Sequence, residues 1–464
     1  MTRRELLMQA LFGTGLVGLR SLATGLPISF LLNPRKAVAA EATGCASNTA
    51  AQYLIFSTSG QGDPVNVNAP GTYQTFGSSS PIHPPTFTPT ALTINGQTVQ
   101  AAPPWAGLMQ PATANGAPMV NRTCFFHHGT YTVVHPDEHN VLSLMDATTS
   151  NEMLVSLLSN QLAPCLGTVQ TEPLSIGGGG ASETITFQGR PQPNLTPRAL
   201  GSTLATPNNA LANLQRIRDA DLDRLNALAR SEGNSAQQAF IDRYSQSQRQ
   251  AREISQSLMG QLEAIPDNSP ASQVAAAMIL IQMNVTPVIT IHIPFGGDNH
   301  VDPELVGETA QTTAGVQTIA QMQASLAGAN MPDGSNMQDR VSFAMLNVFG
   351  RNLLPPDQNG RGHWGNHHCS VLIGKPFQGS VVGGIEPYSK GSTSDFIAQA
   401  INPADGTGVP AGSAPANAIQ FPDTLASMAL TLGQGLGVDP TFLASNIKGP
   451  SGSSAVVTAA LAKG

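Results

Sequence analysis

One run of β-branched and apolar residues constrains the fold of this 464-residue chain more than any other feature. Residues 285–294 read Val-Thr-Pro-Val-Ile-Thr-Ile-His-Ile-Pro. A strand that is apolar on both faces is typical of the buried centre of a parallel sheet. The run is followed at once by Phe-Gly-Gly and then Asp298-Asn299-His300. We therefore expect a central strand with potential ligands at its carboxyl end.

Other apolar runs alternate with helical patterns along the chain. Short strand-like runs are Tyr53 to Phe56, Met119 to Phe126, Val341 to Val348 and Cys369 to Ile373. Helical spacing of apolar residues covers Glu152 to Leu162 and Glu304 to Leu326. Alternating strands and helices predict an α/β fold with a mostly parallel central sheet, and ligands of such sheets gather at the carboxyl edge.

Residues 208–265 have a different character from the rest of the chain. They are rich in charge, contain no proline, and place apolar residues at helical spacing on both sides of Gly233-Asn234. This pattern predicts an exposed helical hairpin that is inserted into, and laid across, the main domain. A supporting role is the simpler interpretation, and a lid over the site is the alternative.

The N-terminus has the order of a secretory signal. Arg3-Arg4 precedes two apolar stretches, and Ala37-Val38-Ala39 is a small-residue cleavage site. The arginine pair indicates the twin-arginine route, so we expect residues 1–40 to be a signal peptide and the product to be periplasmic or secreted. Arg20 interrupts the apolar region, so we expect no stable membrane span after cleavage; an uncleaved anchor is the alternative. Residues 41–464 are then expected to form one domain.

Charge and cysteine content narrow the possible partners. Charged residues make up 11% of the chain and the net charge is −7, with no basic stripe, so nucleic acid is not an expected partner. An exported chain with four cysteines is expected to form two disulfides, and the sequence leaves three pairings open. The cysteines are Cys45, Cys124, Cys165 and Cys369.

Nine of the ten histidines fall in three short windows. Asp298 and His300 follow the central strand, and His363 and His367 precede the strand at Cys369. Imidazole and carboxylate groups at one sheet edge suit a divalent metal such as Zn, Mn or Fe. We therefore expect Asp298, His300 and His363 to bind a metal together with His367 or His368, only one of which should face the site.

The remaining histidines are expected to have simpler roles. His292 lies inside the apolar run and is expected to be a hydrogen-bonded core residue. The first window is expected to be a loop, and within it we expect His139 to come nearest to the site. This window contains His127, His128, His135 and His139.

Three further residues are candidates for catalysis. Ser57 and Ser59 follow the first strand, where a nucleophile is often presented, although serines there more often serve turns and caps. Arg351 follows the strand at Val341 to Val348, and its guanidinium matches phosphate or sulfate. An ion pair behind the site is the alternative role for Arg351.

The order of these motifs resembles a bacterial exported family called domain of unknown function 1501, which is similar to the alkaline phosphatase and sulfatase superfamily. The resemblance rests on Phe-Gly-Gly-Asp298-Asn-His300, on Phe349-Gly-Arg351 and on Gly360-Arg-Gly-His363-Trp, and it extends over the mature chain. It implies a twin-arginine signal and a three-layer αβα, alkaline-phosphatase-like domain. It also implies metal ligands at Asp298 and His300.

The chain departs from the pattern of that family at three positions. Gly362 stands where the family has an aspartate before His363, and Val348 replaces a glutamate. The closing helix, around Thr424 to Met428, has no histidine. The resemblance implies a metal-dependent hydrolase of phosphate or sulfate esters, acting on a small molecule or a glycan. The alternative is a non-catalytic envelope protein on the same fold, which binds glycan or a protein partner.

Overall fold

The computed structural model describes residues 50–463 apart from several gaps. The gaps are 78, 114–115, 150, 169, 178–184, 205–211, 233–255 except for three isolated residues, 356–358 and 392. The expected signal peptide at 1–40, Cys45 and the turn at Gly233-Asn234 lie outside the described residues. Within the part of the chain that is described, no helix combines the length and the apolar character that a membrane crossing requires.

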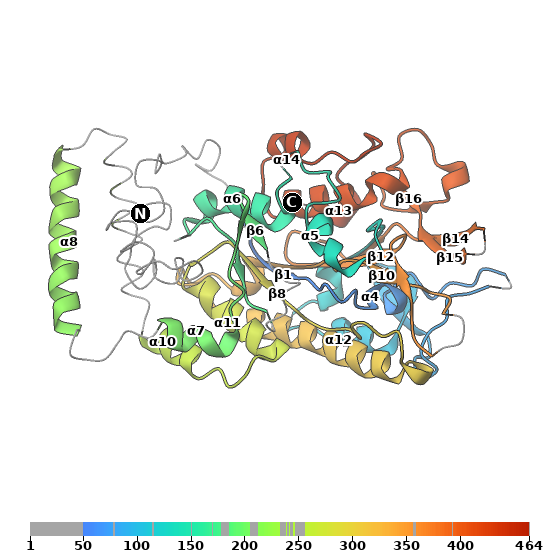
Figure 1. The fold of residues 1–464 in the computed structure, drawn as a ribbon, viewed down its shortest axis with the longest axis horizontal. Helices are drawn as coiled ribbons and strands as arrows, with labels where there is room; N and C mark the ends of the chain where they lie inside the picture. The colour runs from blue at the N-terminus through green and yellow to red at the C-terminus, as the bar shows by residue number, and fades with distance from the viewer. Residues whose placement is uncertain are drawn as a thin grey trace, which may run out of the picture.

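A seven-stranded sheet lies at the centre of the molecule, with the order β13-β4-β12-β9-β1-β8-β5 (Figure 1). Only β12 runs against its neighbours; the other six strands point the same way. The expected α/β fold with a mostly parallel sheet is therefore confirmed. The strands are β1 Tyr53–Ser57, β4 Thr123–His128, β5 Leu174–Ser175, β8 Val288–Ile291, β9 Val341–Met345, β12 His368–Ile373 and β13 Ser380–Val382.

The apolar run at 285–294 forms β8, which lies inside the sheet between β1 and β5. All four of its residues are buried. The strand is shorter than the run: Pro287 directly before it has no N–H to donate to the sheet, although its carbonyl accepts the Leu54 N–H at 2.8 Å. The first strand-like run after the expected leader forms β1 as predicted, but 119–122 forms a 3₁₀ turn and only the residues after it form β4.

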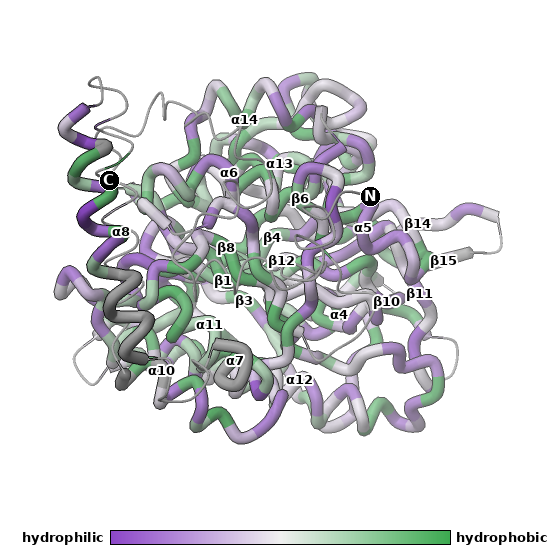
Figure 2. Tube along the Cα trace, turned by 60° about the vertical axis from the view of Figure 1, so that its left-hand side comes forward, coloured by the Kyte–Doolittle hydropathy of each residue, from purple (hydrophilic) through white to green (hydrophobic). Residues whose placement is uncertain are grey.

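Helices cover both faces of the sheet (Figure 1). Alternate residues of β1 enter separate cores: Tyr53 and Ile55 pack on one face, and Leu54 and Phe56 on the other. Figure 2 shows the apolar residues gathered around the strands. One face carries α6 Leu154–Leu166, α13 Thr424–Gly435 and α14 Pro440–Asn446, and the other carries α7 Pro197–Leu204, α11 Pro270–Gln282 and α12 Val306–Ala327.

The expected helical hairpin at 208–265 contains two described helices, α8 and α10. Helix α8 (Ala212–Glu232) stands apart from the sheet in Figure 1, and its Leu225 and Leu228 are exposed. Helix α10 (Gln256–Glu263) packs against α7 and α11. Only the α10 end therefore lies across the main domain, and the segment between α8 and α10 lies largely outside the described residues.

Short ribbons and helices complete the described structure. The β10–β11 ribbon matters most for the site, because its register places Arg351 opposite His363. The other elements are α4 Val65–Asn68, β2 Thr90–Ile94, β3 Gln97–Ala101, α5 Glu138–Leu142, β6 Thr186–Phe187, β7 Arg190–Pro191, β10 Gly350–Arg351, β11 His363–Trp364, β14 Ile385–Lys390, β15 Thr393–Ala398, β16 Ala400–Ile401 and β17 Gly408–Val409.

The expectation of two disulfides is wrong. Cys124 and Cys369 are free thiols, although they lie on neighbouring strands. Cys124 packs into the core on one face of the sheet and Cys369 into the core on the other, so their side chains point apart. Cys165 is disulfide-bonded. The chain therefore forms one disulfide at most.

Candidate metal centre

Sheet topology brings the candidate ligands to one edge. The carboxyl ends of β1, β4, β8 and β9 lie at this edge because these strands are parallel. Strand β12 is antiparallel, so the loop that precedes it reaches the same edge. Asp298 and His300 follow β8, His135 follows β4, and His363 precedes β12.

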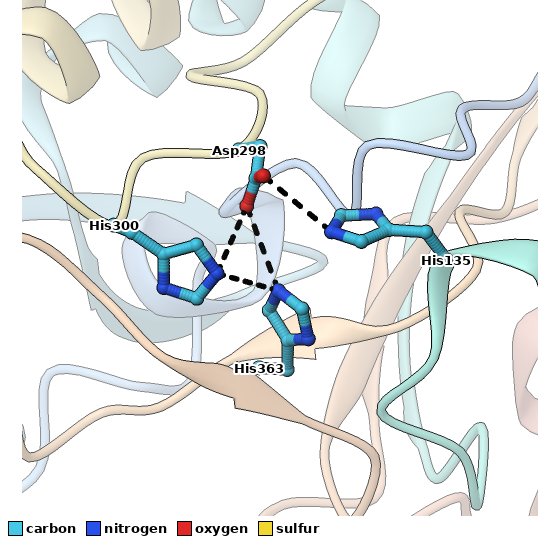
Figure 3. Close-up of side chains that lie close together, drawn as sticks. All are labelled: His135, Asp298, His300 and His363. Carbon is cyan, nitrogen blue, oxygen red and sulfur yellow. Dashed lines mark hydrogen bonds and ion pairs between the residues drawn. The ribbon is translucent and has the colours of Figure 1, made fainter.

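Four side chains converge there, as Figure 3 shows: His135, Asp298, His300 and His363. Each offers one ligand atom, and these atoms all lie within 4.8 Å of one another. Nε2 of His300 lies 2.7 Å from Nε2 of His363 and 3.2 Å from Oδ1 of Asp298. Nε2 of His135 lies 3.5 Å from Oδ2 of Asp298. Three imidazoles and one carboxylate within this space make a donor set for a single metal ion.

Backbone carbonyls fix the tautomer of two of the rings. Nδ1 of His135 lies 2.6 Å from the Gly60 carbonyl, and Nδ1 of His363 lies 2.6 Å from the Val133 carbonyl. A carbonyl only accepts, so each Nδ1 donates a hydrogen bond to its carbonyl, and Nε2 is the nitrogen of each ring that is turned to the cluster. Metal-binding histidines are usually oriented in this way by the group on their other nitrogen.

Arg351 lies behind the carboxylate of Asp298. Its buried guanidinium donates to Oδ1 of Asp298 at 2.9 Å and to the carbonyls of Gln61 and Gly62 at 2.6 Å. Burial raises the pKa of Asp298, but the hydrogen bond and charge of Arg351 outweigh it, and the net shift is downward. Asp298 is therefore ionised and held in place. Of the two roles considered for Arg351, the geometry gives the ion pair behind the site.

The cluster is open to solvent on the His300 side. The His300 side chain is 48% exposed and that of His363 is 21% exposed. Partial burial lowers the pKa of His363, and the charge of Arg351 lowers it further. A lowered pKa keeps this ring neutral near pH 7, which is the form that binds a metal.

His367 and His368 do not join the cluster. His367 is buried, with Nε2 2.9 Å from Nδ1 of His127 and Nδ1 3.2 Å from the Asn66 amide. His368 is also buried and accepts a hydrogen bond from the Asn347 N–H. The His367 ring stacks on His127, and the His368 ring is tilted against His128. His127 and His128 are successive residues of β4, so the two rings face opposite sides as expected. Neither the His367 ring nor the His368 ring belongs to the metal cluster.

The first histidine window supplies a ligand that the sequence analysis did not select. His139 is exposed on α5, and His135 takes the place expected for it. The signal available was position: His135 lies in the loop after β4, at the edge where Asp298 lies, while His139 is already inside a helix.

Asp63 and His292 position the loop that carries Asp298. Oδ1 of the buried Asp63 accepts the N–H groups of Phe295 and Gly297, each at 2.9 Å. Nε2 of His292 lies 3.5 Å from Oδ2 of Asp63. Burial raises the pKa of Asp63, but hydrogen bonds from His292 and Phe295 bring it down to about 2. The carboxylate thus holds the turn between β8 and Asp298.

Ser57 and Ser59 accept backbone N–H groups: Ser57 from the segment after β8, and Ser59 within its own turn. Both are buried. Oγ of Ser57 accepts the N–H of Ile293 at 3.1 Å, and Oγ of Ser59 accepts the N–H of Gln61 at 3.1 Å. Neither hydroxyl belongs to the open side of the cluster, so the expectation of a serine nucleophile is not supported.

Comparisons of the chain with family models, with curated proteins and with solved structures found no match.

Proposed function

We propose that His135, Asp298, His300 and His363 bind one divalent transition metal ion. The observation that carries this is the convergence of their ligand atoms, with two imidazoles already oriented by backbone carbonyls. Imidazole and carboxylate donors suit Zn, Mn or Fe(II). The ion would take the place of the contact between the Nε2 atoms of His300 and His363.

We further propose that the protein is a metal-dependent hydrolase of phosphate or sulfate esters. A bound divalent ion lowers the pKa of a coordinated water and so supplies a hydroxide nucleophile at neutral pH. That source of a nucleophile fits a site in which the Ser57 and Ser59 hydroxyls are engaged with backbone N–H groups. The ester class and the alkaline-phosphatase-like character of the fold rest on the resemblance of the sequence motifs.

A non-catalytic metal protein on the same fold is the second candidate. Four protein donors fill a tetrahedral zinc shell, and closed shells of this kind are usually structural. Mn or Fe(II) accepts more than four ligands and would leave positions for water and substrate. The identity of the bound ion therefore bears on the choice, and the exposure of His300 favours the open, catalytic form.

Export by the twin-arginine route is proposed from the N-terminal sequence. The motif is Arg3-Arg4, ahead of the apolar region and Ala37-Val38-Ala39. Replacing Arg3 and Arg4 by lysine should abolish the periplasmic product, measured by cell fractionation. An unchanged periplasmic yield would reject this route.

The hydrolase proposal is tested with the full chain loaded with Zn, Mn or Fe(II). 4-Nitrophenyl phosphate and 4-nitrophenyl sulfate are the probes, and release of nitrophenol is the readout. We expect the metal-loaded chain to hydrolyse one of the esters, a chelator to abolish this activity and added metal to restore it. Asp298→Asn should lower kcat at least about 100-fold, because it removes a carboxylate ligand of the metal. His139→Ala is the control and should retain full activity. A chain that binds one metal ion but hydrolyses neither ester would contradict the hydrolase proposal and favour the non-catalytic metal protein.

A further inference from the structure

We propose that the substrate of this site is an ester that carries an apolar group, because the metal cluster is flanked by a fixed apolar rim. This inference rests on the proposed hydrolase function and narrows it from esters in general to esters of an alkyl or aryl alcohol. Val133, Val134, Val301 and Val306 make up what we call the valine rim.

The exposed apolar side chains are not scattered evenly over the molecule. Among the described residues, six large apolar side chains are exposed, and four of them form the valine rim. The other two, Leu225 and Leu228, lie on α8, away from the sheet. Exposed apolar surface concentrated at a site usually marks a binding surface.

The first pair of valines is connected to the cluster through the backbone, which forms a hydrogen bond with one ligand and directly precedes another. The Val133 carbonyl accepts the Nδ1 proton of His363, and Val134 directly precedes His135. The Val134 N–H donates to Thr132 Oγ1 at 3.2 Å, and its carbonyl accepts the Asp137 N–H at 3.0 Å. The exposure of this pair, at 48% each, therefore belongs to an anchored loop.

The second pair lies beyond His300. Val301 is 86% exposed, yet its neighbours His300 and Asp302 are each held by hydrogen bonds. The Asp302 N–H donates to the Asn359 carbonyl at 2.7 Å, and the Asp302 carboxylate accepts the N–H groups of residues 307 and 308, which directly follow Val306 at the start of α12. Val134 and Val301 adjoin His135 and His300, which lie on opposite sides of Asp298 in Figure 3. Through these neighbours, the two pairs adjoin ligands on two sides of the cluster.

The two arginines beside the cluster are engaged within the protein. The Arg351 guanidinium is buried against Asp298 and backbone carbonyls. The Arg361 guanidinium is buried against Glu308, at 2.6 Å, and the carbonyls of Ile82 and Asn352. Both guanidinium groups are therefore engaged within the protein, and the exposed valine rim remains beside the metal ligands. Such a pairing of one polar anchor with apolar surface selects an apolar group next to the reacting bond.

Straight-chain alkyl hydroxamates test the rim without knowledge of the natural substrate, because the hydroxamate head binds the metal and only the tail changes. The metal-loaded full chain is titrated by calorimetry with the two-, four-, six- and eight-carbon members. We expect Kd to fall by about twofold to fourfold for each added methylene that is removed from water. The variant Val134→Ser/Val301→Ser should flatten this dependence and leave the two-carbon affinity unchanged. The control Leu225→Ser/Leu228→Ser should behave as the wild type.

A matched series of sulfate or phosphate monoesters of linear alcohols links the rim to catalysis. We expect kcat/KM to rise with chain length in the wild type and in the α8 control, and to stay level in the valine variant. Ester hydrolysis without length dependence, in the ester or the hydroxamate series, would overturn the inference and leave the hydrolase proposal standing. Hydroxamate binding without hydrolysis of any ester would reject both. Light scattering measures the oligomeric state of both proteins. If the wild type is a dimer and the valine variant a monomer, the rim binds a second copy of the chain and the inference is overturned.

Discussion

At the scale of single residues, the carboxylate of Asp298 connects the cluster to the protein behind it. One oxygen, Oδ1, lies 2.9 Å from the Arg351 guanidinium and 3.2 Å from Nε2 of His300. Arg351 in turn is fixed by the carbonyls of Gln61 and Gly62, at the carboxyl end of β1. The arginine therefore sets both the charge and the position of Asp298, without facing solvent itself.

The first prediction concerns Arg351. Arg351→Gln removes the charge that lowers the pKa of Asp298 and one of its hydrogen bonds, so we expect metal affinity to fall about 10-fold to 100-fold, as for other groups that orient a ligand. Arg351→Lys keeps the charge but not the fork of donors and should lose less. Competition with a chelating dye measures the affinity. Arg122→Gln, which breaks the part-exposed ion pair with Asp339, is the control. Unchanged affinity in Arg351→Gln would contradict this role.

At the scale of elements, two loops are packed together so that His300 and His363 meet. Gly360 has φ +140°, and a Cβ there would lie 2.2 Å from the His300 carbonyl oxygen. Beside this contact, the Arg361 N–H donates to the Asn299 carbonyl, and the Asn299 amide donates to Glu308. The close approach of the loops requires glycine at 360.

The second prediction follows from that packing. Gly360→Ala should push the two loops apart and lower metal affinity about tenfold or more, because the ligands must stay within bonding distance of one ion. Gly334→Ala is a matched control: its φ is +84°, but a Cβ there meets nothing within 4 Å. Both variants should lose about 1 kcal/mol of unfolding free energy through backbone strain, but only Gly360→Ala should lose metal. Equal metal affinity in the two variants would refute the loop contact as the cause.

Strands β4 and β12 bring four buried histidines together, which makes stability depend on pH. Burial lowers the pKa of His127 and of His128 to about 4, from an ordinary 6.5. The folded state therefore binds these protons less readily than the unfolded chain. Their contribution is fully present above about pH 6.5 and is lost as the pH falls towards 4. The buried Asp395 has the opposite sign, since burial raises its pKa to about 6.

The third prediction is that the unfolding free energy falls between pH 7.5 and pH 4.5, by up to about 3 kcal/mol for each of these two histidines. Urea denaturation at both pH values measures the fall. His128→Asn should reduce it, because one of the contributing groups is gone. His139→Asn, at an exposed histidine, should leave it unchanged. A fall of the same size in His128→Asn and the wild type would show that His128 does not contribute.

At the scale of the whole molecule, local sequence patterns predicted the secondary-structure elements better than they predicted which distant segments these elements contact. The run at 285–294 predicted an interior strand because a strand buried on both faces needs apolar residues at every position. The convergence of Asp298, His300 and His363 was predicted from their places beside strands. It holds although β12 is antiparallel, because His363 precedes that strand while Asp298 follows β8.

What the sequence did not predict depends on contacts between distant segments. His135 joins the cluster because the loop after β4 reaches the same edge as the loop after β8, and a local pattern carries no information about that pairing. His367 was expected at the site but is buried against His127, because the register of β12 on β4 decides which side it faces. The role of Ser57 likewise depends on an N–H group brought near by folding, that of Ile293.

Metal content of the purified full chain tests the central claim most directly. We expect about one Zn, Mn or Fe(II) ion per chain after loading and dialysis, measured by elemental mass spectrometry, since the four donors suit a single ion. Replacement of a ligand removes a donor, so His135→Ala, Asp298→Ala and His300→Ala should each lose most of the metal while circular dichroism stays unchanged. His139→Ala, from the same segment as His135, should keep it. A wild-type chain that holds no ion and takes up none of the three metals would contradict the proposed site, as would a His135→Ala variant that retains metal in full.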